Sequence, residues 1–116
     1  PHCFIKSAGE TKIAKILILK NIEYITEKRF SDLIDKSRLR FDFYLPLYNA
    51  CIEFDGEQHF KKVKYFGGEK AFKDLQNKDA MKNLYCKTNN IPLLRVRFDD
   101  KNVEGTIHSF LSTLQK

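Results

Sequence analysis

Hydrophobic residues recur along the chain with periods that predict helices and strands in a definite order. Between Ser7 and about Lys20, apolar residues stand three and four positions apart, as on one face of a helix. Ser7 and Glu10 have the spacing of a capping box, which predicts that this helix begins at Ser7. Residues 22–30 are rich in β-branched and aromatic residues and predict a first strand, followed by a polar turn over residues 31–37.

The next segment alternates between apolar and polar residues. Its apolar positions are Leu39, Phe41, Phe43 and Leu45. This period of two predicts a second strand with the side chain of Asp42 on the face opposite the phenylalanines. Pro46 ends that strand and Ala50–Phe54 predicts a third, so the two form a hairpin that turns at residues 47–49.

The second half of the chain predicts a helix, a strand and a closing helix. Two glycines at 67 and 68 mark a loop before a charged helical segment over residues 69–89. Its apolar stripe is expected to comprise Ala71, Phe72, Leu75, Leu84 and Tyr85, with Asp79 at the margin. Residues 91–98 predict a strand, and Val103–Leu114 predicts a helix with its apolar side inward. The order α-β-β-β-α-β-α indicates an α/β fold, with a mixed sheet of about four strands flanked by helices.

The composition fits one folded domain spanning residues 1–116. The 116 residues suit a single core, and 42% apolar residues with ten phenylalanines are enough to fill it. The longest apolar run, Ile13–Leu19, contains Lys15 and falls short of the roughly 20 residues that cross a bilayer, so no membrane association is expected. The three cysteines (Cys3, Cys51 and Cys86) cannot all pair with one another, which favours reduced thiols in a cytoplasmic setting.

The charge balance favours a polyanionic partner. The net charge is +6, and Lys61, Lys62 and Lys64 cluster after the third predicted strand. Such clusters attract phosphates and bind them with salt-dependent affinity. Lysine-rich faces are also ordinary on soluble proteins, so charge alone leaves a nucleic-acid partner and a plain solvated surface as equal alternatives.

Acidic residues gather at the ends of the second and third predicted strands. Glu53 and Asp55 share one face of the third strand because side chains alternate. If the hairpin aligns that face with Asp42, two or three carboxylates converge, and they stay ionised only with a cation between them. Oxygen ligands favour Mg²⁺ over zinc, so the pattern predicts a magnesium site.

A histidine follows these acids at a distance that suits catalysis. His59 lies four residues beyond Asp55, after a glycine that permits a sharp turn back toward the strand end. A neutral imidazole there can accept a proton from water, while the metal stabilises charge on a phosphate oxygen. These are the two requirements of phosphodiester hydrolysis.

Each of these residues also has a purely structural explanation. Asp42 alone is more often a solvated acid on the outer face of a sheet, and Asp55 precedes a glycine, as in many turns. A single histidine such as His59 is more often a surface or core residue than a catalyst. Glu10 is explained by the capping box and Asp79 by an exposed helix surface. The joint pattern is harder to explain in this way, because a sheet would rather cover the shared surface with apolar groups.

Two stretches resemble a known family of nucleases. Residues 40–46, Arg-Phe-Asp-Phe-Tyr-Leu-Pro, and residues 52–60, Ile-Glu-Phe-Asp-Gly-Glu-Gln-His-Phe, are similar to phage and bacterial endonucleases related to the very-short-patch-repair enzyme. These enzymes belong to the PD-(D/E)xK superfamily and include homing endonucleases with a Glu-Asp-x-His-Asp active site. The likeness covers nearly the whole chain and implies a restriction-endonuclease-like core.

The resemblance implies a role for each residue of the pattern. By this resemblance Asp42 is the principal metal ligand and His59 is the catalytic histidine. Glu10 and Asp79 are supporting acids, and Asp55 occupies the variable position of the pattern, which is written x. The resemblance also implies that the backbone of Phe54 helps to hold the metal. From the convergence of the carboxylates, we further expect Asp55 to bind the metal, with the side chain of Glu53 as another ligand.

The chain departs from the wider superfamily pattern in two ways. Glu53-Phe54-Asp55 has an aspartate where that pattern has lysine, and no proline precedes Asp42. The role of the usual lysine is therefore open. Relatives often carry a Cys-Pro-x-Cys knuckle before the nuclease helix, and residues 1–6 are interpreted as the end of such an upstream region. Because one cysteine cannot hold zinc, no structural zinc is expected.

The pattern and the resemblance together predict a DNA endonuclease that depends on Mg²⁺, with Mn²⁺ as an alternative ion. Its expected contacts with the DNA backbone are Lys61, Lys62, Lys64 and Lys70. The predicted setting is homing-type cleavage in the cytoplasm of a bacterial host or a phage-infected cell, where a homodimer would serve double-strand cleavage. The alternatives are a nucleic-acid-binding module that does not cut, an RNA nuclease and a plain interaction domain.

Overall fold

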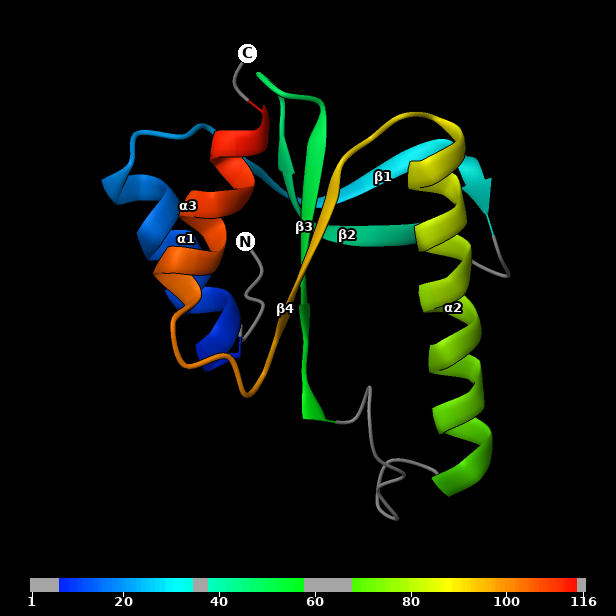
Figure 1. Cartoon of the computed structure of the whole chain (residues 1–116). Coiled ribbons are helices and arrows are strands. Elements are labelled where there is room, and N and C mark those ends of the chain that lie inside the picture. The colour runs from blue at the N-terminus through cyan, green and yellow to red at the C-terminus, as the bar shows by residue number, and fades with distance from the viewer. Residues whose placement is uncertain (1–6, 35–37, 58–67, 115–116) are drawn as a thin grey trace, which may run out of the picture.

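The computed structural model describes residues 7–34, 38–57 and 68–114, and within them the elements follow the predicted order (Figure 1). They are α1 (Ala8–Leu19), β1 (Ile25–Ile34), β2 (Arg38–Leu45), β3 (Ala50–Asp55), α2 (Gly68–Thr88), β4 (Leu93–Arg97) and α3 (Val103–Leu114). The predicted α/β architecture is therefore confirmed. His59, Lys61, Lys62 and Lys64 lie outside the described residues.

The described strands form a four-stranded mixed sheet in the order β1-β2-β3-β4. The first two pairs are antiparallel, and β3 pairs with β4 in parallel. Because a parallel neighbour cannot be reached through a tight turn, the chain crosses over between β3 and β4 through α2. Figure 1 shows the resulting layers: α1 and α3 lie side by side on one face of the sheet, and α2 lies on the other.

Apolar side chains fill the space on both faces of the sheet. The cluster under α1 and α3 includes Ile13, Leu17, Phe43, Ile52 and Ile107. The cluster under α2 includes Phe41, Cys51, Cys86 and Ile91. Both of these cysteines are buried free thiols. Side chains alternate between the two faces along β3, since Ile52 and Cys51 belong to opposite clusters.

Helix α1 begins where the capping box predicts. The Ser7 hydroxyl accepts a hydrogen bond from the Glu10 amide at 3.1 Å, and the Glu10 carboxylate accepts one from the Ser7 amide at 3.2 Å. Two amides at the helix start thereby gain partners that the helix itself cannot supply. Since the reciprocal bonds hold Glu10 at the first turn, its carboxylate has a defined place at this end of the molecule.

Strand β2 departs from the expected alternation. Phe41 and Phe43 are both fully buried, but Phe43 packs under α1 and α3, whereas Phe41 packs under α2. The prediction that the phenylalanines share one face is therefore wrong. Pairing with β3 runs from Leu45 back to Phe43, and beyond that point β2 continues with β1 as a two-stranded ribbon, which twists more strongly than a wider sheet. Glu27, with a φ of 58°, interrupts the regular backbone of β1 opposite this point.

Two further sequence-based expectations are wrong. A turn was expected over residues 31–37, but β1 continues to Ile34 because Leu33 is buried in the cluster under α2. Leu84 was expected in the apolar stripe of α2, yet 65% of it is exposed. The contact side of α2 is formed by Cys86, with Met81 and Tyr85 packed beside it.

Among the described residues, no helix combines the length and apolarity that a membrane span needs.

Candidate active site

Strands β2 and β3 part where their acidic residues meet. Backbone pairing reaches Phe43 opposite Ile52, and the next residues along the two strands are Asp42 and Glu53. The Asp42 amide donates to Glu53 Oε2 at 2.6 Å, and the Phe54 amide donates to Asp42 Oδ2 at 2.8 Å. The two carboxylates therefore accept the amide hydrogens at the point where the diverging backbones cease to pair.

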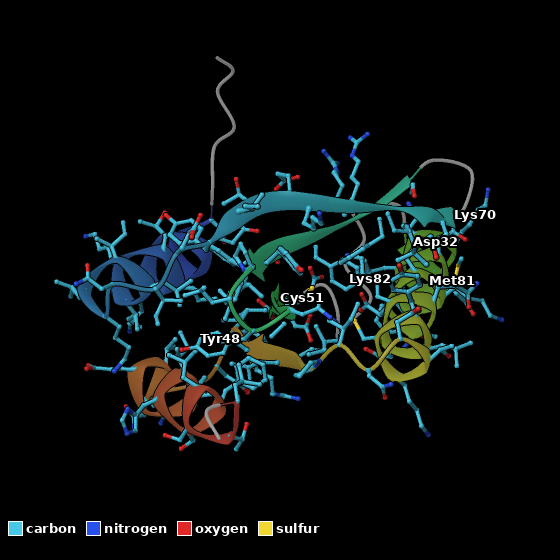
Figure 2. All side chains as sticks on the ribbon, turned by 90° about the horizontal axis from the view of Figure 1, so that it is seen from above. Asp32, Tyr48, Cys51, Lys70, Met81 and Lys82 are labelled. Atoms are coloured by element: carbon cyan, nitrogen blue, oxygen red, sulfur yellow. The ribbon has the colours of Figure 1, made fainter. Side chains whose placement is uncertain are left out.

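Glu53 is a buried acid, and both of its oxygens have partners. It is 3% exposed, and its Oε1 accepts a hydrogen bond from Lys82 Nζ of α2 at 2.9 Å. Figure 2 shows Lys82 on the side of α2 that faces the sheet. Burial raises the pKa of Glu53, and the ammonium of Lys82 acts against this rise. Charged partners at a buried carboxylate favour one orientation of the group, so Glu53 is a rigid acceptor for the Asp42 amide.

Asp42 is a half-buried acid beside other negative charges. Burial raises its pKa from 3.8 to about 7, the charge of Glu53 adds to the rise, and Glu10 contributes in the same direction. The Phe54 amide and the charge of Lys82 act against it. No hydrogen bond to Oδ1 comes from the described residues, whereas Oδ2 is bound to the Phe54 amide. The ionised form of such a carboxyl is stabilised most effectively by a nearby cation.

Glu10 reaches this region from α1, whose first turn lies against β3. A Cβ added at Gly9 would stand 2.2 Å from Cε1 of Phe54, which is closer than two carbon atoms approach without a bond. The absence of a side chain at Gly9 therefore lets the helix contact the ring directly. Since the charge of Glu10 acts on Asp42, residues of α1, β2 and β3 combine at one place.

A second charged group surrounds Arg95 of β4. Its Nη1 lies 2.8 Å from Asp55 Oδ1 and 3.7 Å from Asp79 Oδ1. Its Nη2 donates to the carbonyl of Asp79 at 3.3 Å, and its Nε donates to Asn83 Oδ1 at 2.9 Å. Asp55 is only 5% exposed, so this ion pair is largely withdrawn from water. The guanidinium thus connects β3 and β4 to α2 and pairs with both acids.

The structure places the predicted site residues in two adjoining groups. Asp42, Glu53 and Phe54 form the first with Glu10 nearby, and Asp55 and Asp79 surround Arg95 in the second. The groups adjoin, since Glu53 of the first lies beside Arg95 of the second in the parallel register of β3 and β4. Within residues 7–34, 38–57 and 68–114, no three acids, histidines or cysteines form a group that could hold a metal ion. The assignment of metal ligands stays a prediction.

Of the other predicted site residues, the structure describes Lys70, whereas His59 and the three lysines that follow it lie within residues 58–67, outside the described part of the chain. Lys70 is exposed in the first turn of α2 and is visible in Figure 2. His59 precedes it outside the described residues, so its position relative to Asp42 stays a prediction from sequence.

Lys82 and Arg95 are site residues that the sequence-based interpretation missed. One indication was available, because buried carboxylates such as Glu53 and Asp55 require cationic partners. Lys82 also stands three residues after Asp79 on a helix, a spacing that places both on one side of it. The pairing itself depends on the rotation of α2 and on the parallel register of β3 with β4, which no local pattern reveals.

Comparisons with known proteins give no family assignment. No family model matches the chain, and no solved structure gives a significant match. The chain is similar to uncharacterized protein 307L of Invertebrate iridescent virus 6, with 31% identity over 77 residues that make up 66% of this chain and 39% of that protein. It is also similar to uncharacterized protein 094L of Frog virus 3 (isolate Goorha), with 29% identity over 97 residues that make up 75% of this chain and 63% of that protein. The chain thus spans less than two thirds of the length of these viral relatives.

Proposed function

We propose that this chain is the catalytic domain of a metal-dependent DNA endonuclease that hydrolyses phosphodiester bonds. The observation that supports this function most directly is the meeting of Asp42 and Glu53 where β2 leaves β3, with the charge of Glu10 also acting on Asp42. Burying acids that repel one another costs free energy, so a plain interaction domain gains nothing from them. A site that binds a metal ion and, through it, a substrate phosphate does benefit from these acids, because the ion offsets their repulsion.

The surroundings of Asp42 fit a divalent cation. Burial and neighbouring acids disfavour its ionised form, and a cation would reverse that effect. Mg²⁺ is commonly held by one or two carboxylates and completes its shell with water and substrate oxygens, so a group of three acids is not a requirement. We assign Asp42 as the principal ligand, with the Phe54 backbone and the side chains of Glu53 and Asp55 as further candidates. When bound, Mg²⁺ or Mn²⁺ would stabilise the charge that develops on the phosphate.

The residues of the chain divide the remaining tasks. The Phe54 amide holds Oδ2 of Asp42, and we assign Oδ1, which accepts no hydrogen bond from the described residues, to the reacting centre. His59 accepts the proton of the attacking water, as its place in the sequence suggests. Glu10 and Asp79 orient these groups from α1 and α2.

Contacts with the substrate backbone are a separate part of the proposal. They are assigned to Lys61, Lys62, Lys64 and Lys70. Cleavage of the homing type in a virus- or phage-infected cell, with a homodimer acting on both strands, belongs to the same proposal.

Cleavage of supercoiled plasmid tests the function. Nicked or linear DNA should form with Mg²⁺, disappear with EDTA, and form at least roughly 100-fold more slowly in Asp42→Asn and His59→Ala. Asp74→Asn, which changes an exposed acid of α2, is the matched control and should cleave like the unaltered chain. Unchanged cleavage by folded Asp42→Asn would contradict the assignment. Salt-sensitive DNA binding without cleavage would favour the non-catalytic module, and stronger competition by RNA would favour an RNA nuclease.

A further inference from the structure

We propose that Lys82 is a positioning residue of this site, which acts through Glu53 to hold Asp42 in its working orientation. The superfamily pattern places a lysine two residues after the acid of the third strand, and this chain has Asp55 there instead. The geometry points to a cation supplied by α2 in its place. The consequence for cleavage rests on the proposed nuclease function, whereas the positioning itself does not.

A continuous chain of hydrogen bonds connects Lys82 to both sides of Asp42. The ammonium donates to Glu53 Oε1 at 2.9 Å, and Glu53 Oε2 accepts from the Asp42 amide at 2.6 Å. The Asp42 carboxylate in turn accepts from the Phe54 amide at 2.8 Å. The backbone of Asp42 is therefore held by Glu53 and its side chain by Phe54. Because Glu53 has Lys82 at its other oxygen, the ammonium determines which way Glu53 faces.

The burial of Lys82 distinguishes it from the other lysines of α2. Its side chain is 14% exposed and that of Glu53 is 4% exposed, while its Nζ lies 5.4 Å from the centre of the Phe41 ring. Lys70, Lys73, Lys78 and Lys87 of the same helix are exposed. Withdrawing an ammonium from water is unfavourable unless it is paired, so its place beside Glu53 is a specific one. An ammonium enclosed in this way is also poorly placed to bind a DNA phosphate.

Arg95 does not take over this task. It lies beside Glu53 in the parallel register and acts on it through its charge. Its hydrogen bonds, however, go to Asp55, Asp79 and Asn83. Among the described residues, Lys82 is therefore the cation that fixes the carboxylate of Glu53 by direct contact.

The amide proton of Asp42 gives a readout that does not require any cleavage. A short hydrogen bond to a carboxylate moves an amide resonance strongly downfield and protects the amide from exchange. In Lys82→Met, Glu53 loses its ammonium, so the Asp42 amide resonance should move upfield and exchange faster. Lys82→Arg, which keeps a cation, should restore much of the shift, and Lys87→Met, which removes an exposed lysine of α2, should leave it unchanged.

Kinetic constants test the consequence for the reaction. Loss of a group that orients a metal ligand typically costs 10- to 100-fold, so kcat of Lys82→Met should fall by roughly that factor with little change in KM. Lys82→Arg should recover much of kcat, and Lys87→Met should keep all of it. If Lys82→Met does not fold, Lys82→Gln, which retains a donor without the charge, is measured in the same two ways.

The positioning of Asp42 by Lys82 and its effect on cleavage can be contradicted independently. An Asp42 amide that does not respond to Lys82→Met overturns the positioning chain, whether or not the protein cuts DNA. A shifted amide with unchanged kcat overturns the role of Lys82 in the reaction. Absence of cleavage by the unaltered chain contradicts the nuclease function, and the amide measurement then decides the positioning by itself.

Discussion

The carboxyl of Asp42 is half-buried and feels the negative charges of Glu53 and Glu10, so ionising it costs free energy in the folded chain. In the unfolded chain the same group has its ordinary pKa, near 3.9. Because its pKa in the folded chain is about 7, the two states bind different numbers of protons between these values. Stability is therefore lost as pH rises from about 4 to about 7, and the full cost is present above that range.

Asp42→Asn should stabilise the metal-free protein, and increasingly so at higher pH. The amide side chain keeps an oxygen for the Phe54 amide and removes the charge. A rise in pKa from 3.8 to about 7 corresponds to at most ~4 kcal/mol, so the gain in unfolding free energy should approach that limit at pH 8 and vanish near pH 4. Urea denaturation in EDTA at both pH values measures it. A gain that is the same at both would show that Asp42 titrates normally.

Arg95 should contribute more to stability than its neighbour Arg97 on the same strand. Arg95→Met removes the guanidinium from buried Asp55, and breaking a buried pair costs roughly 3 to 5 kcal/mol. Arg97→Met, whose pair with Asp99 is about half exposed, should lower the unfolding free energy much less, because water and salt screen an exposed ion pair.

Asp55→Asn introduced together with Arg95→Met should recover part of the unfolding free energy that Arg95→Met alone loses. The double variant no longer buries an unpaired carboxylate. Chemical denaturation of the single and double variants forms the double-mutant cycle. Equal costs for Arg95→Met and Arg97→Met would contradict the structural role of Arg95.

The acids of β2 and β3 were predictable from residue spacing, whereas their cations were not. Alternation along β3 and a tight hairpin together bring Asp42 beside Glu53, and both features depend on neighbours in sequence. Lys82 is 29 residues from Glu53, and Arg95 is 40 residues from Asp55. Contacts at such separations depend on the packing of α2 and the register of β4, so alternation and periodicity contain no information about them.

At the scale of elements, the contact between α1 and β3 determines how closely Glu10 approaches the sheet. It depends on Gly9, which faces the Phe54 ring without a side chain between them. The periodicities predicted the existence and order of the helices and strands because each element buries its own apolar side. They did not predict that Phe41 and Phe43 lie on opposite faces, since that change follows from where β2 loses its partner.

Gly9→Ala should destabilise the protein, although the same change stabilises most helices by up to ~1 kcal/mol. The new methyl would meet the Phe54 ring, and overpacking of this kind typically costs about 1 to 3 kcal/mol. Phe54→Leu in the same chain should relieve the contact and restore part of the loss. Thermal denaturation of the variants measures both effects, and a higher Tm for Gly9→Ala alone would show that α1 does not pack as described.

At the scale of the whole molecule, a net charge of +6 favours a nucleic-acid partner without identifying one. If the exposed lysines at the start of α2 follow a DNA backbone, each contact releases counterions and steepens the dependence of binding on salt. The relevant quantity is the slope of log affinity against log salt, because it reports the number of phosphate contacts.

Lys70→Ala should lower the steepness of that slope by about one and weaken binding to all duplex sequences alike. Lys15→Ala, which removes an exposed lysine of α1 on the other face of the sheet, is the matched control and should leave the slope unchanged. Fluorescence anisotropy with labelled duplexes at several salt concentrations measures both. Equal slopes for the two variants would place the DNA path elsewhere.

The parallel pairing of β3 with β4 also has a consequence for the order of events during folding. β1, β2 and β3 are joined through short connections, so their contacts close small loops and form early. β4 pairs with β3 only after α2 has crossed the sheet, which closes a much longer loop. Arg95 arrives with that last strand, so Asp55 receives its counter-charge late. We expect the acids of β2 and β3 to stay in water until β4 docks, so that their burial coincides with that step.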